Sequence, residues 1–437
     1  CLNWGCIPTK ALLKSAQVYE YIKHAQDFGL EASGKQNFGA VIKRSRGVAD
    51  KMSKGVQFLM RKNKIDVVMG FGKIVAKARP DDPVGRGKIE VTSPDNTKQT
   101  VEGKHIIIAT GARSRQLPSM PIDGKKIIGY REAMSLPEQP KSMIVVGSGA
   151  IGVEFGYFYN SMGTKVTIVE FLPRVVPVED EEISKELEKS LKKQGINIMV
   201  SSEVTKVDTS GNGVKATVKT DSGEQIIEAD ILLSAIGVQA NIEGIGLEEL
   251  GVKVDNDRVM VDKYGQTNVP GIYSIGDCAP GQALAHVASK EAIICVENIA
   301  FTEKKYNHQP EPLDYNNVPG CTYCIPEIAS VGFTEKQAKD AGYEIKVGKF
   351  PLSASGKASA AGHTEGFVKV IFDAKYGEWL GTHMIGYNVT EIIAETVTAR
   401  KLETTYHEVL NSIHPHPTIS EGIKDAIEVA YGEAIHL

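Results

Sequence analysis

The sequence predicts an α/β protein of several domains, and three observations carry this prediction. Its 437 residues are enough for two to four domains, each with its own core. Between residues 143 and 170 a buried strand, a glycine-rich turn, a helix and a second strand follow one another, which is the order of a βαβ unit with parallel strands. After residue 312 the pattern changes to short strands and then helices, which indicates a separate α+β domain.

The composition is that of an ordinary globular protein, with 24% charged and 42% apolar residues. A formal net charge of -4 gives no basic surface for nucleic acid or anionic lipid. No apolar run approaches a membrane span, because glycines and Glu154 interrupt the most apolar stretch. Six cysteines are too few for a secreted disulfide scaffold. The sequence therefore favours a reducing compartment and one catalytic disulfide.

The chain opens with Cys1-Leu2-Asn3-Trp4-Gly5-Cys6-Ile7-Pro8-Thr9-Lys10, and the residues that follow predict a helix with Pro8 at its first position. A helix amino terminus stabilises a thiolate, so Cys6 is expected to be the more acidic sulfur. Two nearby cysteines are often ordinary buried residues. A zinc site would need a second pair, for which Cys321 and Cys324 lack the usual histidine spacing. The residues around the first pair favour a dithiol/disulfide redox couple.

Helix and strand patterns alternate over the next hundred residues. We expect a helix from Phe38 to Lys64 and a strand from Asp66 to Ile74. Shorter strands are expected at Lys88 to Val91 and at Thr100 to Val101. The run from His105 to Ala112 is expected to be a buried strand that meets a tight glycine turn, although such a run also occurs with an arbitrary turn.

The most specific pattern is Met143-Ile144-Val145-Val146 followed by Gly147-Ser148-Gly149-Ala150-Ile151-Gly152, a helix through Met162, and a strand from Lys165 to Glu170. Strand, glycine loop, helix, strand and terminal acid in this order predict a dinucleotide site, with a pyrophosphate at the helix start. Glu170 would accept a ribose hydroxyl and repel a 2′-phosphate, which favours NAD over NADP. A solvated strand-end acid and, because Arg174 lies nearby, an NADP site are the alternatives.

Further strands are expected at Ile196 to Val200, Val214 to Thr220 and Ile231 to Ile236. The run from Thr267 to Asp277 predicts a strand whose carboxylate emerges just past a glycine. Such an acid often bonds a ribose or ribityl hydroxyl. Its structural alternative is to cap the helix expected from Ala283 to Phe301.

The last part of the chain combines short strands with helices. Strands are expected at Ala329 to Gly332, Phe367 to Phe372 and Trp379 to Ile385, with helices from Val389 onward. The run from His414 to Glu421, HPHPTISE, places a carboxylate close behind a histidine. Histidine suits proton transfer near neutral pH, and a carboxylate can orient its ring. Alone such a pair is more often structural, but a disulfide pair that needs thiol deprotonation gives it a catalytic use.

The segment CLNxGCIPxK resembles the redox-active disulfide segment of the flavin-dependent pyridine nucleotide-disulfide reductases, and with HxHPTxSE it looks most like the dihydrolipoamide dehydrogenase family. The resemblance runs over essentially the whole chain. It implies two Rossmann-like dinucleotide-binding domains, the first truncated, and a C-terminal α+β dimerisation domain. The implied segments are a partial FAD-binding domain (1–114), an NAD-binding domain (115–240), a region completing the FAD domain (241–312) and an interface domain (313–437).

The resemblance also implies roles for individual residues. Cys1 and Cys6 would form the redox disulfide, and His416, with Glu421 as its partner, would accept protons at the disulfide of the other subunit of a homodimer. FAD contacts are implied for Lys10, Gly72, Thr110, Gly111, Ala112, Asp277, Ala283, Leu284, Ala285 and His286. NAD contacts are implied for Gly147, Ser148, Gly149, Ala150, Ile151, Gly152, Val153, Glu154, Glu170, Val204 and Gly237. No metal is implied. The family usually has arginine after the position of Gly237, where this chain has Val238.

The implied reaction is the oxidation of protein-bound dihydrolipoamide to lipoamide, with electrons passing through the disulfide and FAD to NAD+. The implied partner is a lipoyl-carrying protein of a 2-oxo acid dehydrogenase or glycine cleavage complex, in the cytoplasm or, in a eukaryote, the mitochondrial matrix. A glutathione- or mercury-type reductase is the first alternative. Three features disfavour this alternative: Glu170, the LNxGCIP motif, and a carboxy terminus that has no cysteine pair. A truncated, non-catalytic chain is the second.

The resemblance finally implies a flavin-binding βαβ unit, with its own GxGxxG, ahead of Cys1. We therefore expect this sequence to belong to a longer polypeptide. A molecule that truly began at Cys1 would be expected to bind the flavin weakly or not at all, because the adenosine end would lack its glycine turn.

Overall fold

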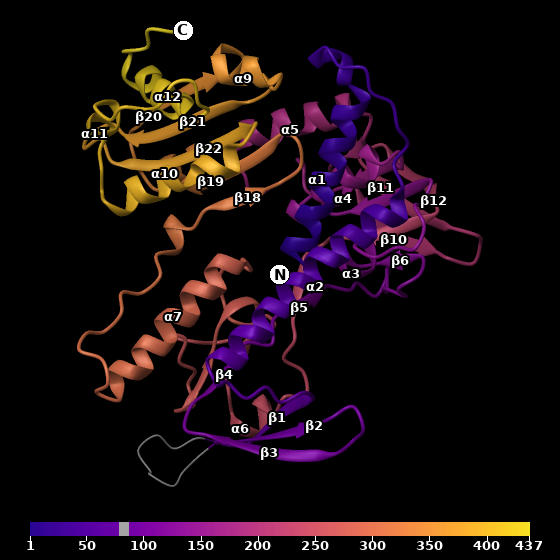
Figure 1. Ribbon diagram of the computed structural model, residues 1–437, viewed down its shortest axis with the longest axis vertical. Helices are drawn as coiled ribbons and strands as arrows, with labels where there is room; N and C mark the ends of the chain where they lie inside the picture. The colour runs from indigo at the N-terminus through magenta and orange to yellow at the C-terminus, as the bar shows by residue number, and fades with distance from the viewer. Residues whose placement is uncertain (78–86) are drawn as a thin grey trace. The chain divides into compact units, whose positions relative to one another are not determined.

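The computed structural model describes residues 1–77 and 87–437, which form two compact units. The first unit contains Cys1–Ser53, Gln116–Gly237 and Asn316–Leu437, and the second contains Lys54–Arg115 and Val238–Tyr315. Within the described ranges no helix is long and apolar enough to cross a bilayer, and no three His, Cys, Asp or Glu side chains gather as a metal site would require. Figure 1 shows the elements of each unit.

The first unit contains a five-stranded parallel sheet in the order β6-β13-β7-β8-β9. Its strands are β6 (Ile127–Ile128), β13 (Ile231–Ser234), β7 (Ser142–Val146), β8 (Lys165–Val169) and β9 (Asn197–Met199). Helix α4 (Ala150–Ser161) joins the central pair β7 and β8, as the glycine pattern predicts. The strands are apolar because both faces of the sheet are covered, one by helices and the other by β10 (Glu203–Asp208) and β11 (Val214–Thr220). The predicted α/β class is confirmed.

Helix α1 (Cys6–Lys23) packs against α4. Leu12, Leu13 and Ala16 are buried in one core with Phe155 and Tyr159 of α4, so the helix that begins at the cysteines is fixed to the helix that begins at the glycine loop. The expectation that Pro8 opens α1 is wrong, because the helix already begins at Cys6. Proline is tolerated there because N–H groups of the first turn have no intrahelical acceptor.

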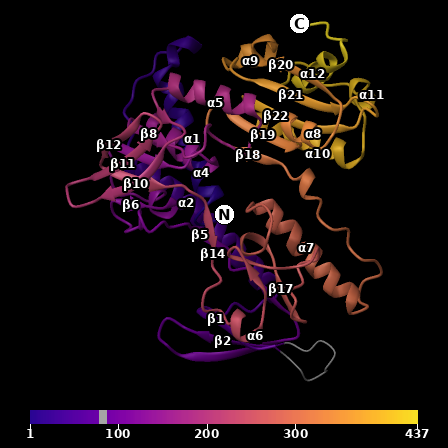
Figure 2. The same ribbon diagram turned by 180° about the vertical axis from the view of Figure 1, so that it is seen from behind.

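A second sheet of the first unit is antiparallel, in the order β18-β19-β22-β21-β20. Its strands are β18 (Gly320–Thr322), β19 (Glu327–Gly332), β22 (Trp379–Gly386), β21 (Phe367–Asp373) and β20 (Ile345–Pro351). Helices α10 (Val389–Lys401) and α12 (Glu421–Tyr431) share a core with Val368 and Phe372 of β21. Ile371, which points the other way, packs in the core of α8 (Glu335–Asp340). Figure 2 shows this sheet from behind.

A buried lysine ties this sheet to the start of α5 (Glu181–Lys193). The side chain of Lys369 on β21 is 2% exposed, and its Nζ lies 3.0 Å from Asp180 Oδ1 and 2.8 Å from both Glu182 Oε2 and Glu335 Oε2. Burial would raise the pKa of Asp180, but the charge and hydrogen bond of Lys369 outweigh it and lower that pKa. The cluster therefore joins three elements through one ammonium.

The second unit consists of small sheets and one long helix. Strands β1 (Phe71–Ala76), β2 (Gly87–Thr92) and β3 (Lys98–Gly103) form an antiparallel sheet, and β4 (Ile106–Ile108) pairs in parallel with β17 (Ile272–Ser274). Two short pairs complete it, β5 (Ala112–Ser114) with β14 (Val238–Ala240) and β15 (Val254–Asp255) with β16 (Arg258–Val259). Its helices are α6 (Leu247–Leu250), η2 (Gly276–Cys278) and α7 (Ala285–Thr302).

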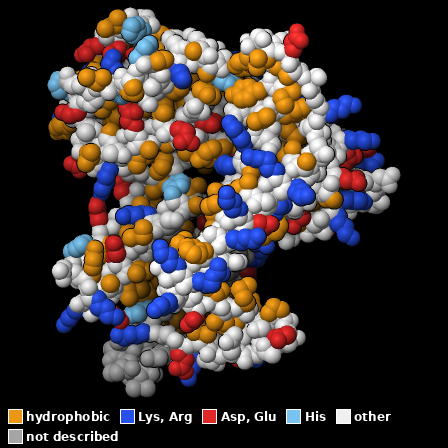
Figure 3. Space-filling view, in the orientation of Figure 1, with side chains coloured by type: hydrophobic (Ala, Val, Ile, Leu, Met, Phe, Trp, Pro, Cys, Tyr) orange, Lys and Arg blue, Asp and Glu red, His pale blue; other side chains and the backbone are white. Residues whose placement is uncertain are grey.

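The remaining elements are β10 (Glu203–Asp208), β11 (Val214–Thr220), β12 (Gly223–Ala229), η1 (Ala25–Phe28), α2 (Phe38–Lys62), α3 (Tyr130–Ala133), η3 (Tyr315–Asn317), η4 (Leu352–Ala354), α9 (Gly356–Ala361) and α11 (Tyr406–Leu410). Figure 3 shows basic side chains gathered over α2. The strand expected from Asp66 is wrong before Phe71. No described strand pairs with residues 66–70, and the side chains of Val67 and Met69 are exposed, so their strand propensity has no ladder to join.

Candidate active site

The two cysteines form a disulfide at the start of α1. Cys1 is exposed and Cys6 is half-buried. Cys6 is the first residue of the helix, after Gly5, which offers no capping side chain. The first-turn N–H groups and the helix dipole therefore favour negative charge at the Cys6 sulfur. When the disulfide opens, Cys6 is the better place for a thiolate, as the sequence predicts.

Lys10 lies one helical turn beyond Cys6, and residues four apart on a helix share a face. Its Nζ lies 2.8 Å from both carboxylate oxygens of Glu154 on α4. The Glu154 side chain is 6% exposed and that of Lys10 is 32% exposed. The resemblance assigned these two residues to different cofactors, and the structure joins them. The ion pair connects the helix of the disulfide to the helix of the glycine loop.

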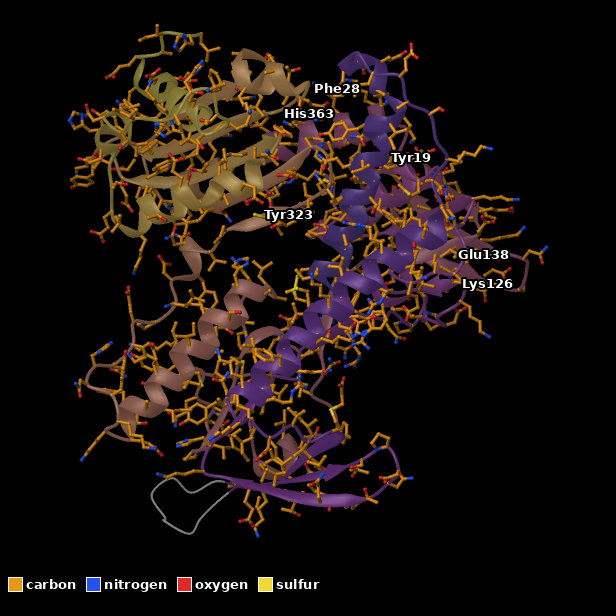
Figure 4. All side chains as sticks on the ribbon, viewed as in Figure 1. Tyr19, Phe28, Lys126, Glu138, Tyr323 and His363 are labelled. Carbon is orange, nitrogen blue, oxygen red and sulfur yellow. A yellow bond between two sulfur atoms is a disulfide. The ribbon has the colours of Figure 1, made fainter. Side chains whose placement is uncertain are left out.

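No sequence pattern indicates the third participant, Tyr323, which directly follows β18. Its backbone N–H donates to Glu154 Oε1 at 3.0 Å, and its ring centroid lies 4.2 Å from Lys10 Nζ. Figure 4 labels this residue. A separation of more than 300 residues from Lys10 left no local signal that could have revealed the contact.

The glycine loop has the shape that a pyrophosphate needs. Gly147 has φ +96°, and a Cβ on it would lie 2.5 Å from the Ala235 carbonyl oxygen. A Cβ on Gly152 would lie 2.0 Å from the Gly147 oxygen, whereas a Cβ on Gly149, the residue before α4, would meet no atom within 4 Å. Two glycines thus permit the close turn and the third leaves open space at the helix start. These residues fit a dinucleotide.

Glu170 lies beside this loop, just past β8. Its Oε2 accepts hydrogen bonds from the Ser148 backbone N–H and hydroxyl, both at 2.7 Å, and its Oε1 accepts the Leu172 N–H at 2.8 Å. The acid is buried, so the alternative of a solvated strand-end residue is wrong. Arg174 does not pair with it and instead donates to the Pro177 carbonyl. A negative charge is thus fixed next to the glycine loop.

Other residues assigned to NAD occupy the surrounding loops and sheet. Ile151 and Val153 lie on α4, and Ala150 begins it. Val204 is buried on β10, which pairs antiparallel with β11, in a core shared with Val146 and Val169 of the parallel sheet. Gly237 follows β13 with φ +111° and open space at its Cβ position, and Val238 after it enters β14.

Most residues assigned to FAD lie in the second unit. β4 and β17 run parallel with Ile108 opposite Ser274, so the turns after them, Thr110-Gly111 and Gly276-Asp277, emerge at the same edge. Ligands of α/β sheets bind at this carboxyl edge. Ala112 begins β5 and Gly72 lies on β1. Ala283 and the N-cap Leu284 precede α7, which begins with Ala285 and His286. Asp277 lies in η2 and does not cap α7, whose N-cap is Leu284.

Cys1, Cys6 and Lys10 belong to the first unit. In the second unit, the residues assigned to FAD offer backbone groups at strand ends, the Asp277 carboxylate and the N–H groups at the start of α7. This set fits hydroxyl and phosphate groups such as those of a flavin dinucleotide. The residues assigned to FAD are therefore suited to it by their chemistry.

His416 and Glu421 are in direct contact. His416 Nδ1 lies 2.9 Å from Glu421 Oε1, and Glu421 Oε2 accepts the Thr418 N–H at 2.7 Å. Partial burial would raise the pKa of Glu421, but the hydrogen bonds from Thr418 and His416 outweigh it and lower that pKa. The His416 side chain is 78% exposed. The carboxylate fixes Nδ1, which leaves Nε2 as the nitrogen that can take a proton from a substrate.

The neighbouring His414 makes a different contact. Its Nε2 lies 2.7 Å from Glu395 Oε1, and its side chain is 8% exposed. The hydrogen bond with Glu395 raises the pKa of His414. His414 is therefore held inside the fold, whereas His416 faces solvent.

Comparisons with known proteins agree with this geometry. A family model described as "Pyridine nucleotide-disulphide oxidoreductase" matches residues 1–292, and one described as the dimerisation domain of the same proteins matches residues 318–427. A dihydrolipoyl dehydrogenase of Rhizobium etli is 50% identical, covering 100% of this chain and 91% of that protein. The one of Zymomonas mobilis is 44% identical with the same coverage. A mitochondrial dihydrolipoyl dehydrogenase of Pisum sativum is 39% identical, covering 100% of this chain and 85% of that protein.

Solved structures give the same result for the fold. The crystal structure of LpdA from Mycobacterium tuberculosis superposes with a TM-score of 0.88 at 25% identity, covering 98% of this chain and 90% of that chain. The Cu(II) complex of a mutant of RclA, an HOCl-induced flavoprotein disulfide reductase from Escherichia coli, superposes with a TM-score of 0.84 at 26% identity and the same coverage.

Proposed function

Because the chain belongs to the pyridine nucleotide-disulphide oxidoreductase family and, within it, to the dihydrolipoyl dehydrogenases, we propose how its residues divide the reaction. The activity is the oxidation of dihydrolipoamide to lipoamide by an FAD- and NAD-dependent flavoprotein. The observation that carries the residue assignment is the Cys1–Cys6 disulfide at the start of α1, one turn from the Lys10–Glu154 pair. The dimerisation domain over residues 318–427 supports a homodimer.

His416 begins the reaction as a general base. With Nδ1 held by Glu421, its Nε2 accepts the proton of one dihydrolipoyl thiol. The resulting thiolate attacks Cys1, the exposed sulfur, and the Cys1–Cys6 bond breaks to release Cys6 as a thiolate. The second substrate thiol then displaces Cys1 and closes the lipoyl disulfide, so the substrate is oxidised and the cysteine pair is reduced. We propose that His416 serves the cysteines of the other subunit.

This step leaves a negative charge on the Cys6 sulfur, one helical turn from the Lys10 ammonium. The helix start and the ammonium one turn away both favour the Cys6 thiolate. Thr110, Gly111, Asp277 and the start of α7 would hold FAD, which would supply the electron acceptor between the cysteine pair and NAD+. The loop from Gly147 to Gly152 binds the NAD pyrophosphate. Glu170 accepts from the ribose and disfavours a 2′-phosphate.

The division of the chain into segments remains part of this proposal. Residues 1–114 and 241–312 would serve FAD, residues 115–240 would serve NAD, and residues 313–437 would form the subunit interface. The lipoyl group would arrive on a carrier protein of a 2-oxo acid dehydrogenase or glycine cleavage complex. The site of action would be the cytoplasm or, in a eukaryote, the mitochondrial matrix.

Steady-state assays with matched substrate pairs test the proposal. The holoenzyme should reduce NAD+ with dihydrolipoamide and should use neither NADP+ nor glutathione at a comparable rate. Its absorbance spectrum should show bound flavin. Turnover of glutathione disulfide with NADPH at a rate equal to that of lipoamide with NADH would contradict it and favour a glutathione-type reductase.

A further inference from the structure

We propose that Tyr323 is a positioning residue that holds the Lys10 ammonium on the side of α1 shared with Cys6 and thereby sets the reactivity of the Cys6 thiolate. The inference rests on the proposed role of Lys10 beside the redox pair. It assigns a role in the chemistry to a segment of the C-terminal sheet, far from the cysteines in sequence. Figure 4 labels Tyr323, which lies between the end of β18 and the start of α1.

Tyr323 contacts both members of the ion pair. Lys10 Nζ lies 4.2 Å from the centroid of the Tyr323 ring, within the range of a cation–π contact. The Tyr323 backbone N–H donates to Glu154 Oε1 at 3.0 Å. One residue thus fixes the carboxylate with its backbone and attracts the ammonium with its side chain.

The position of Tyr323 is itself determined by its neighbours. Cys321 lies on β18 opposite Ala329 of β19, so strand pairing fixes the backbone just before Tyr323. Cys324 on the other side is fully buried in the core that contains α4. The ring therefore lies in a segment anchored at both ends, and it can restrain a flexible lysine.

Two carboxylates, Glu154 and Glu327, act on the groups around Tyr323, and Glu327 accepts its hydrogen bonds from Thr390. Burial raises the pKa of Cys321 to about 11 and also raises the pKa values of Tyr323 and Cys324. These three groups stay protonated near neutral pH, so none of them adds a charge. Glu154 is the carboxylate that pairs with Lys10, and the ring is a second, uncharged attraction on the same ammonium.

The cation–π contact with the Tyr323 ring matters because the lysine side chain is long and its ammonium group is strongly hydrated. The Lys10 side chain is 32% exposed and has several rotatable bonds, so without the ring it has room to turn outward. An ammonium that spends less time on the Cys6 side of α1 stabilises the Cys6 thiolate less. Loss of the ring should therefore raise the pKa of the Cys6 thiol in the reduced enzyme.

The test measures this thiol in the holoenzyme. After reduction with a phosphine, the rate of iodoacetamide modification of Cys6 is followed against pH by peptide mass spectrometry. Tyr323→Leu, which removes the ring, should move the midpoint upward by about 0.5 pH unit or more. Tyr323→Phe keeps the ring face and should leave the midpoint unchanged. Tyr323→Met removes the ring with an unbranched chain and provides the same test if the leucine variant does not fold.

Two further variants make the result specific. Tyr19→Leu is the matched control, because Lys23 Nζ lies 4.5 Å from the Tyr19 ring on the same helix without touching the Lys10–Glu154 pair. It should leave the midpoint where it is. Lys10→Met should move the midpoint at least as far as Tyr323→Leu.

Three outcomes would overturn the inference in different ways. A shift in Lys10→Met with none in Tyr323→Leu or Tyr323→Met would refute the role of Tyr323 and leave that of Lys10 intact. No shift in Lys10→Met would overturn the inference together with the proposed role of Lys10. An equal shift in Tyr323→Phe and Tyr323→Leu would show that the ring face is not the cause.

Discussion

Lys10 Nζ lies 2.8 Å from both carboxylate oxygens of Glu154, across 144 residues of sequence. The contact joins the helix that carries the redox disulfide to the helix that begins at the dinucleotide loop. Because Glu154 is buried and Lys10 is partly exposed, the pair stabilises the fold and holds a cation on the residue one helical turn beyond Cys6.

We predict that Lys10→Met lowers the free energy of unfolding by about 2 kcal/mol, because it leaves a buried carboxylate without its charge partner. Urea denaturation of the oxidised protein measures this. Lys23→Met is the control, since Lys23 pairs with Glu20 where both side chains are about one-third exposed and such pairs contribute about 0–1 kcal/mol. Equal losses of unfolding free energy in the two variants would show that the buried Lys10–Glu154 pair stabilises the fold no more than the exposed pair does.

Glu170 should decide between the two nicotinamide cofactors. Glu170→Gln removes the negative charge beside the Ser148 N–H, so we expect the ratio of kcat/KM for NADH to that for NADPH to fall by about tenfold, or about 1.4 kcal/mol. Glu203→Gln on β10 is an exposed control that should leave the ratio unchanged. If the unsubstituted enzyme already uses NADPH as well as NADH, the argument from the ribose is wrong.

His416→Gln should slow dihydrolipoamide oxidation by about 10²-fold or more, the usual scale for a lost acid/base group, while the flavin stays bound. Glu421→Gln should slow it less, because the histidine remains but loses the carboxylate at Nδ1. Stopped-flow reduction by dihydrolipoamide separates this step from turnover. His407→Gln, an exposed histidine of α11, should behave like the unsubstituted enzyme, and a fully active His416→Gln enzyme would exclude the proposed base.

The Lys369 cluster should make the protein lose stability in acid. The pKa values of Asp180, Glu182 and Glu335 are lowered in the fold from ordinary values of 3.8 and 4.5, in each case against the penalty of burial. The folded state therefore binds fewer protons than the unfolded state below about pH 4.5, and the stabilisation present above that pH is lost as the pH falls. Lys369→Met should make this loss shallower in urea titrations at pH 3.5 and 6. An unchanged pH dependence would contradict the assignment.

The local patterns in the sequence predicted much of the fold. The βαβ unit, β11 and α10 lie where the periodicity places them, because apolar strands, glycine turns and helix repeats are local signals. The strand expected from Asp66 is wrong in its first half, since apolar β-branched residues predict a strand even where no neighbour pairs with them. No local sequence pattern predicts that residues 1–53 form one compact unit with residues 116–237 and 316–437.

In the candidate site, too, the sequence predicts residues within a short motif but not contacts between distant segments. Motifs located the cysteines, the glycine loop and the His416–Glu421 pair, which are each contained in a short segment. The contacts of Lys10 with Glu154 and of Tyr323 with both could not be predicted, because long-range side-chain contacts depend on how α1, α4 and β18 pack. Thr418, whose N–H fixes the second oxygen of Glu421, was overlooked although it lies within the motif.

The most direct test of the account combines thiol labelling with turnover in the unsubstituted holoenzyme and in Cys6→Ser. The chain has six cysteines, and four of them, Cys278, Cys295, Cys321 and Cys324, are free thiols. In peptide maps of the air-oxidised, denatured enzyme these four cysteines should take up a thiol label, and Cys1 and Cys6 should take it up only after reduction by dihydrolipoamide. Cys6→Ser should lose NAD+ reduction while Cys295→Ala retains it. Labelling of both Cys1 and Cys6 in the air-oxidised protein, or undiminished turnover in Cys6→Ser, would contradict the claim that electrons pass through this disulfide.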